Sequence, residues 1–284
     1  MTTITATMPT QTPQAPRAPR AARAARTARA RHVLASEWIK LRSVRSTYLT
    51  LLIAAVATVS IGYLVTRGHA THWATMTAQD RAIFDPVSDS FTGLGFAQLA
   101  FGVIGVLAIS SEYATGLIRT TFAAVPRRRA VLAAKAVVVG ALTLTAGELL
   151  AFATFFAGQQ ALSAGHLGVT LAHPGVLRGV LAAGFYLAVM AWVGLGLGAI
   201  IRHTAGAITA MIGVVFLLPH IIQALPAPWD IRIGKYSLDI AAQQVIAQHP
   251  AAGYFPAGPS FLIMAGYAAA AIAAAALLVT RRDA

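Results

Sequence analysis

Long apolar stretches alternate with short polar segments along most of the chain. Six of these stretches are long enough to cross a bilayer, whose hydrocarbon core needs about 20 helical residues. Their predicted bounds are residues 47–66, 93–111, 131–157, 180–201, 205–225 and 261–280. The pattern predicts an all-α integral membrane protein with six transmembrane helices.

The polar segment between the second and third stretches, residues 112–129, has a pattern of its own. A helix that begins at Gly116 would end before Pro126. It would carry three apolar residues on one face, at positions i, i+4 and i+7: Ile118, Phe122 and Val125. An ordinary basic loop that fixes membrane orientation would explain Arg127 but not this face. We favour a docking element for a partner, which would also use Glu112, Tyr113, Gly116, Arg119 and Arg127.

The amino-terminal region divides into two parts. Residues 1–31 are a low-complexity Ala/Pro/Arg/Thr segment, and we expect a disordered tail that is attracted to lipid. Residues 32–284 form the membrane domain, and we expect its first part to be an interfacial helix capped by Ser36. The residues expected to form this helix at the membrane surface include Glu37, Trp38, Lys40 and Arg42.

The longest polar loop, residues 226–260, contains five prolines and one helical pattern. We expect a short amphipathic helix over residues 237–248. It would direct five apolar side chains toward the membrane: Leu238, Ala241, Ala242, Val245 and Ile246.

Composition supports a membrane protein and sets its orientation. The chain is 57% hydrophobic and 11% charged, too little charge for the surface of a soluble protein of 284 residues. Its net charge of +13 comes mostly from basic residues beside apolar segments. Lipid head groups and orientation explain these residues better than nucleic acid does. With the amino terminus inside, 17 of the 22 Lys and Arg residues fall on the inner side, so we expect both termini in the cytoplasm.

Motifs for enzymatic chemistry are missing from the sequence. The only Gly-Lys pair, Gly234-Lys235, lacks the other residues of a nucleotide-binding loop, so the chain is not expected to hydrolyse ATP. His69 and His72 have no third ligand at motif spacing, and we expect no metal site. Gly194 and Gly198 form a G-x-x-x-G pair, which predicts close packing of helices.

Two polar features lie inside the apolar stretches. Glu148 is the only acidic residue deep in a span, where a charge costs at least about 2.5 kcal/mol. It belongs either to a translocation path or proton relay, or to a structural hydrogen bond. Pro219 and His220 lie in the fifth span, where proline removes one backbone hydrogen bond and favours a bend. These three residues are candidates for a translocation path.

Several segments resemble one known family. They are residues 37–47 (EWIKLRSVRST), 112–121 (EYATGLIRTT), 125–128 (VPRR) and 155–159 (FFAGQ). Together with residues 229–236 (WDIRIGKY), they are similar to the permease subunits of type-2 ATP-binding-cassette (ABC) transporters, particularly those of actinobacteria. The resemblance covers residues 33–282. One departure is SLDI at residues 237–240, where relatives often carry proline and asparagine.

The resemblance implies an exporter permease in the bacterial inner (plasma) membrane. Such a permease pairs with a second copy or a related permease and binds a separate cassette ATPase, which holds ATP and Mg²⁺. The interfacial helix and a cytoplasmic coupling helix at residues 112–129 would contact that ATPase. Two other functions remain open: an ion-gradient-driven transporter that uses Glu148, and an intramembrane hydrolase that uses Glu148 and His220.

Overall fold

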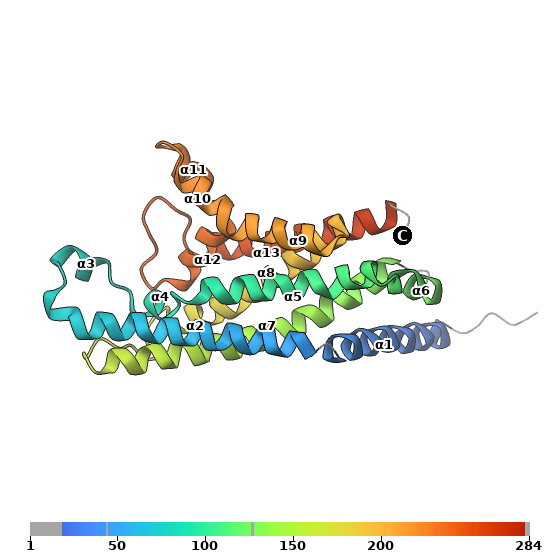
Figure 1. The fold of residues 1–284 in the computed structure, drawn as a ribbon, viewed down its shortest axis with the longest axis horizontal. Coiled ribbons are helices and arrows are strands. Elements are labelled where there is room, and N and C mark those ends of the chain that lie inside the picture. The colour runs from blue at the N-terminus through green and yellow to red at the C-terminus, as the bar shows by residue number, and fades with distance from the viewer. Residues whose placement is uncertain (1–18, 44, 126–127, 282–284) are drawn as a thin grey trace, which may run out of the picture.

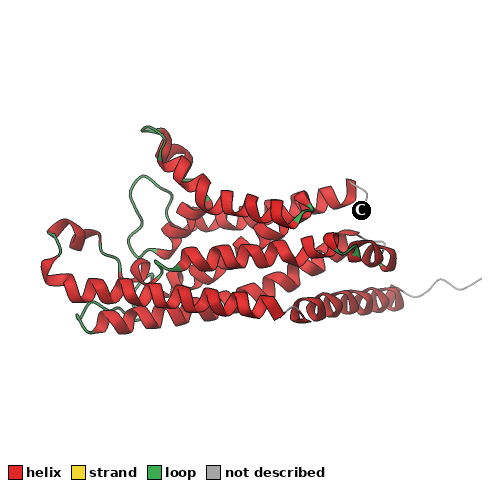
Figure 2. Cartoon of the chain, in the orientation of Figure 1, coloured by secondary structure: helices red, strands yellow, loops and turns green. Residues whose placement is uncertain are grey.

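The computed structural model describes residues 19–43, 45–125 and 128–281, and the regular structure in these residues is all helical (Figure 2). Six helices, one of them interrupted, are long and apolar enough to cross a membrane. They are α2 (Arg45–His72), α5 (Leu94–Ala114), α7 (Arg128–Ser163), α8 (Val176–Ile201), the fifth span from α9 (Thr204–Ile212) to α10 (Leu218–Gln223), and α13 (Ala257–Arg281). The predicted all-α architecture with six such helices is confirmed.

The remaining helices precede, connect or interrupt these six. They are α1 (Pro19–Ser43), η1 (Trp73–Thr75), α3 (Ala78–Ile83), α4 (Pro86–Ser90), α6 (Leu117–Ala124), η2 (Gly213–Leu217), α11 (Trp229–Gly234) and α12 (Leu238–Ile246). Helices α2 and α7 extend past the predicted spans, to His72 and Ser163. Apolar residues mark only the part of a helix that matches the hydrocarbon core, and the backbone hydrogen bonds continue into polar sequence.

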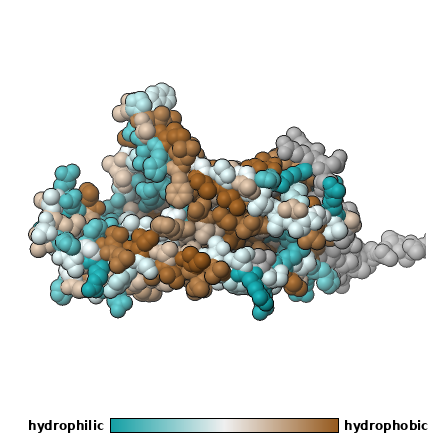
Figure 3. All heavy atoms as spheres, viewed as in Figure 1, coloured by the Kyte–Doolittle hydropathy of each residue, from teal (hydrophilic) through white to brown (hydrophobic). Residues whose placement is uncertain are grey.

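The chain runs back and forth along the bundle. Helices α1 and α6 and the last turn of α13 lie at one end, which we call the α6 end (Figure 1). Helices α3, α4 and α12 lie toward the other, the α12 end. Brown, apolar residues cover much of the middle of the visible surface, while hydrophilic residues gather toward its ends (Figure 3). Exposed apolar side chains such as Leu52, Ile53 and Leu64 of α2 suit contact with lipid.

Helix α8 is the most buried of the six long helices and packs against α5, α7 and α13. Glycines bring its backbone against α5. A Cβ atom on Gly194 would lie 2.0 Å from the carbonyl oxygen of Gly102, and one on Gly198 would lie 2.9 Å from that of Val106. The predicted close-packing role of Gly194 and Gly198 is therefore confirmed.

The fifth span is irregular where the sequence places Pro219. A π-helical segment, η2, precedes α10, and the backbone N–H of Leu218 bonds to the carbonyl of Gly213, five residues earlier. Proline has no N–H for the carbonyl four residues before it, and its ring crowds that carbonyl in a regular α-helix. The wider π turn accommodates this proline, whose side chain is buried.

Helix α1 differs from the sequence expectation. It begins at Pro19, so residues 19–31, expected to belong to a disordered tail, are helical; residues 1–18 lie outside the described residues. Ser36 is not a helix cap but lies inside α1, where its hydroxyl donates to the carbonyl of Val33. The physical reason is composition, because alanine and arginine are both strong helix formers.

Helix α12 forms where an amphipathic helix was expected, but its apolar face has a different neighbour. Its apolar side chains are buried against α8 and α13 rather than directed toward the membrane: Leu238, Ala241, Ala242, Val245 and Ile246. An amphipathic pattern identifies the helix face that is shielded from water, but it does not distinguish contact with lipid from contact with protein. Helix α12 is thus part of the core at this end of the bundle.

Candidate functional site

Four charged side chains from three helices meet at the α6 end. Glu37 and Lys40 come from α1, Glu112 from the last turn of α5, and Lys135 from α7. The Nζ atom of Lys135 lies 2.8 Å from Glu112 Oε1 and also donates to Glu37 Oε2. The Nζ atom of Lys40 lies 2.7 Å from Glu37 Oε1 and 3.0 Å from Glu112 Oε1. We call these four residues the charge cluster.

The charge cluster is buried and its formal charges balance. Glu37, Glu112 and Lys135 are each at most 5% exposed, whereas Lys40 is partly exposed. Burial disfavours the charged form of Lys40, but hydrogen bonds from its ammonium group to Glu37 and Glu112 outweigh this effect and raise its pKa. Removing one member of a buried ion pair typically costs about 3–5 kcal/mol, because a charge is left without a partner. The cluster therefore fastens α1 to α5 and α7.

Sequence reasoning identified three of these residues but not their common site. It assigned Glu37 and Lys40 to a helix at the membrane surface and Glu112 to contact with a partner protein. The structure buries Glu112 inside the chain, so its side chain is not available to a partner. Lys135 was missed. The available signal was a cation inside a predicted span, which requires an acidic partner nearby.

A short helix, α6, begins five residues after Glu112 of the charge cluster, at Leu117. Gly116 precedes it with a φ of +73°, a left-handed conformation that glycine adopts without strain. Ile118 is only 4% exposed and packs within the chain, so it cannot be the partner contact that its spacing suggested. Leu117 of α6 is instead exposed, at 52%, and Arg119 on the same helix is also exposed. Arg127 and the side chain of Phe122 lie outside what the structure describes.

A second contact joins α5 to the end of α8. The guanidinium carbon of Arg202 lies 5.1 Å from the centre of the Tyr113 ring, a cation–π geometry. Arg202 ends α8 with a φ of +58°. One turn earlier on α5, Ser110 accepts a hydrogen bond from Thr204 of α9 at 3.0 Å. Tyr113, expected to face a partner, is thus half-buried against its own chain.

The exposed face of α1 lies next to the charge cluster. Trp38, Ile39 and Arg42 are exposed, whereas Glu37 on the same turn is buried. Together with Leu117 and Arg119 of α6, these side chains give the α6 end an exposed apolar and basic surface. We call these five residues the α6-end surface.

The candidate residues of a translocation path lie apart from this surface. Glu148 is half-buried on α7, and its carboxyl carbon would lie 2.4 Å from a Cβ atom on Gly184 of α8. Its buried Oε2 atom has no hydrogen-bond partner among the described residues. His220 Nδ1 instead lies 2.6 Å from the carbonyl oxygen of Phe216, within the same fifth span. No hydrogen bond or ion pair joins Glu148 to His220 in the described part of the chain.

His69 has a carboxylate partner rather than the metal-like pairing with His72 that its spacing allowed. Its ring nitrogen is hydrogen-bonded to Asp89. Burial raises the pKa of Asp89, and the contact with His69 opposes that shift. No cluster of three or more potential metal ligands occurs in residues 19–43, 45–125 and 128–281.

No family model matches the sequence, and no curated protein matches it. Any functional assignment therefore rests on the sequence patterns and the geometry of the chain.

Proposed function

We propose that this chain is the membrane-spanning permease subunit of an ABC-type exporter. It would lie in a bacterial plasma membrane with both termini in the cytoplasm, as one of two permeases that bind a separate cassette ATPase. One observation carries the proposal: the charge cluster joins residues 37–47 to residues 112–121, the two segments in which the resemblance to such permeases is strongest.

The fold supports mechanical coupling between an ATPase and the transmembrane helices. The α6-end surface exposes an apolar side chain, Leu117, beside Arg119, and such a pair suits a partner with an apolar groove and acidic residues. Ile118 holds α6 against the bundle. The charge cluster ties α1 to α5 and α7, so a displacement of α1 or α6 reaches two long helices directly.

An exporter of this kind alternates between two conformations, and its ATPase must contact these two conformations differently. A partner shifts a conformational equilibrium only by as much as its affinities for the two states differ. Because the sequence holds no nucleotide-binding loop, ATP would act on this chain only through the ATPase. Contacts at the α6-end surface that change as the ATPase closes would supply that difference.

The test is co-purification of the tagged chain with cassette ATPases co-expressed from the genome that encodes it. Leu117→Asp combined with Arg119→Glu should abolish co-purification, because both changes oppose an apolar and acidic partner surface while Ile118 stays in place. The control is Ile83→Asp, which places the same charge on an exposed apolar residue at the other end of the bundle. Full retention of the ATPase by the double variant would reject this docking surface.

A transporter driven by an ion gradient is the second candidate, and the unpaired Oε2 of Glu148 favours it. Glu148→Gln keeps the side-chain shape and removes the titratable group. The second candidate predicts gradient-driven transport by the purified chain without ATP, lost in Glu148→Gln. Transport that requires ATP and persists in Glu148→Gln would reject it.

A further inference from the structure

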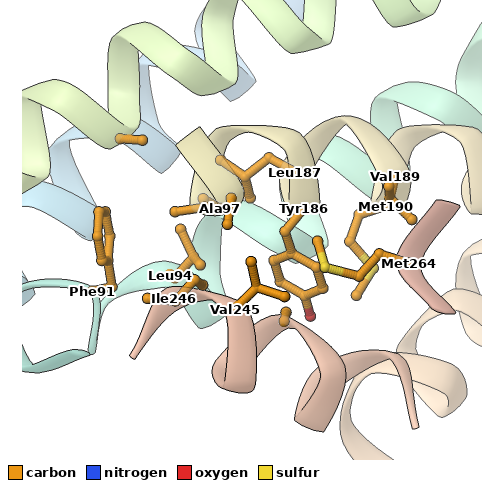
Figure 4. Close-up of a cluster of buried hydrophobic side chains, with 14 of the residues drawn as sticks. Phe91, Leu94, Ala97, Tyr186, Leu187, Val189, Met190, Val245, Ile246 and Met264 are labelled. Carbon is orange, nitrogen blue, oxygen red and sulfur yellow. The ribbon is translucent and has the colours of Figure 1, made fainter. Parts of the chain in front are cut away.

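A cavity of about 410 Å³ lies at the α12 end of the bundle. Its walls come from α12 and the segment after it, the first turns of α5 and the preceding turn, and Tyr186 of α8. Figure 4 shows four of its lining residues, Phe91, Leu94, Tyr186 and Ile246, with Tyr186 reaching from α8 toward α12. The cavity lies toward the opposite end of the bundle from the charge cluster and shares no residue with it (Figure 1).

Some polar side chains in the wall of this cavity have hydrogen-bond partners and one buried acceptor has none among the described residues. The hydroxyl of Tyr186 donates a hydrogen bond to Gln98 Oε1, so each of these two buried groups has a partner. Asp239 accepts a hydrogen bond from Gln243 at 2.8 Å. Gln244 is only 5% exposed, yet its Oε1 atom has no partner among the described residues. Buried polar atoms are nearly always paired, so an unpaired acceptor in a cavity wall is available to a hydrogen-bond donor that binds there.

The charge of the cavity contrasts with that of the chain. The net charge is +13, but Asp239 is the one Asp, Glu, Lys or Arg residue in the described lining. Burial raises the pKa of Asp239, and hydrogen bonding from Gln243 and the nearby His220 oppose that shift. The lining also includes the imidazole of His249, which is exposed. A cation would therefore find a compensating charge here and an anion would not.

The remaining walls are largely apolar. Phe91, Leu94 and Ile246 belong to the buried hydrophobic cluster that surrounds Tyr186 (Figure 4). Pockets of this kind, an apolar wall with a few converging polar groups, are typical of small-molecule sites. The ligand that matches both features has an apolar body and one positively charged donor group.

We propose that this cavity binds an amphiphilic organic cation whose primary ammonium group donates hydrogen bonds to Asp239 and Gln244. The apolar part of the ligand lies against the side chains of Phe91, Leu94 and Ile246. The inference rests on the proposed function only for placing this end of the bundle outside the cell, because binding needs neither ATP nor an ATPase. It assigns this end of the permease a site for cationic cargo or a cationic effector.

The test is isothermal titration calorimetry of the purified full chain with 2-phenylethylammonium, at about pH 8 so that ordinary imidazoles are neutral. We expect saturable binding with a Kd of about 1 mM or tighter. The neutral analogue 2-phenylethanol, of the same size, should bind at least about tenfold more weakly because it cannot pair with a carboxylate. Absence of saturable binding, or equal binding of the two compounds, would overturn the proposal.

Substitutions locate the binding site. Asp239→Asn keeps the shape and the contact with Gln243, and should weaken binding of 2-phenylethylammonium at least about tenfold. Gln244→Met should weaken it about threefold to tenfold through loss of the acceptor. The matched control is Asp80→Asn, which removes the same charge from an exposed residue of α3 and should leave the Kd unchanged. Equal binding by wild type and Asp239→Asn would contradict the site.

The two proposals fail separately. Leu117→Asp with Arg119→Glu should lose the ATPase and still bind 2-phenylethylammonium with the wild-type Kd. If the double variant loses the ATPase but the wild type binds no cation, the cation site alone is rejected. If the wild type binds the cation but no ATPase co-purifies with it, the permease assignment alone is rejected.

Discussion

Lys135 is the residue on which the α6 end depends most, because its ammonium group is shared by two buried carboxylates. Replacing it with methionine keeps most of the side-chain volume and removes the charge. Glu37 and Glu112 would then share only Lys40, which is partly exposed and lies 3.0 Å from Glu112. Leaving a buried charge without its partner costs about 3–5 kcal/mol, so we expect Lys135→Met to destabilise the attachment of α1 by about that amount.

Hydrogen–deuterium exchange of the purified chain measures this attachment locally. In wild type, amides of residues 32–43 should be protected by docking on α7; in Lys135→Met they should exchange faster by about two orders of magnitude or more. The control is Lys235→Met, which removes the same group from the segment between α11 and α12 and should leave α1 unchanged.

A double variant separates a lost charge pair from a general packing defect. Glu112→Gln with Lys135→Met removes one acid together with the base and leaves Glu37 paired with Lys40, so α1 should be better protected than in Lys135→Met alone. Equal protection of α1 in wild type and Lys135→Met would refute the reasoning, since a buried cluster that holds α1 cannot lose its shared cation without effect.

Three further predictions follow from other parts of the structure. Gly194→Val should destabilise the bundle by several kcal/mol, seen as a lower thermal midpoint, because even a Cβ atom there would lie 2.0 Å from the Gly102 carbonyl. The pKa of Lys40 in the folded chain is raised above 10.5, so its contribution to the stability of the folded chain is complete below pH 10.5. That contribution is lost as the pH rises through the folded pKa. The thermal midpoint should therefore fall above pH 10.5 more steeply in wild type than in Lys40→Met. Asp85 caps α4 and accepts from the backbone N–H of Gln248, so Asp85→Ala should cost about 1–3 kcal/mol and speed amide exchange after α12.

The sequence predicted the number and approximate positions of the long helices along the chain well, because apolar length is a direct physical requirement of the bilayer. The packing of Gly194 and Gly198 was predictable for a similar reason, since small residues at that spacing allow two helix backbones to meet. The helix over residues 117–124 was predictable from Gly116 and Pro126, which mark where it begins and ends.

Neighbours in space were much harder to predict from a single sequence. The face that carries Ile118 was correctly read as apolar, but a pattern does not say whether the chain itself or a partner covers that face. The same ambiguity affected α12, whose apolar face packs on α8 and α13. Lys135 was counted only as an inner-side charge, because its acidic partners Glu37 and Glu112 are 98 and 23 residues away along the chain.

The most direct test of the account is the side of the membrane on which α6 lies. The chain has no cysteine, so Thr120→Cys on α6 and Gln79→Cys on α3 each introduce a single thiol at an exposed position. A membrane-impermeant maleimide applied to intact cells should label Gln79→Cys and should label Thr120→Cys only after permeabilisation. Labelling of Thr120→Cys in intact cells would place α6 outside, where no cytoplasmic ATPase could contact it, and would contradict the account.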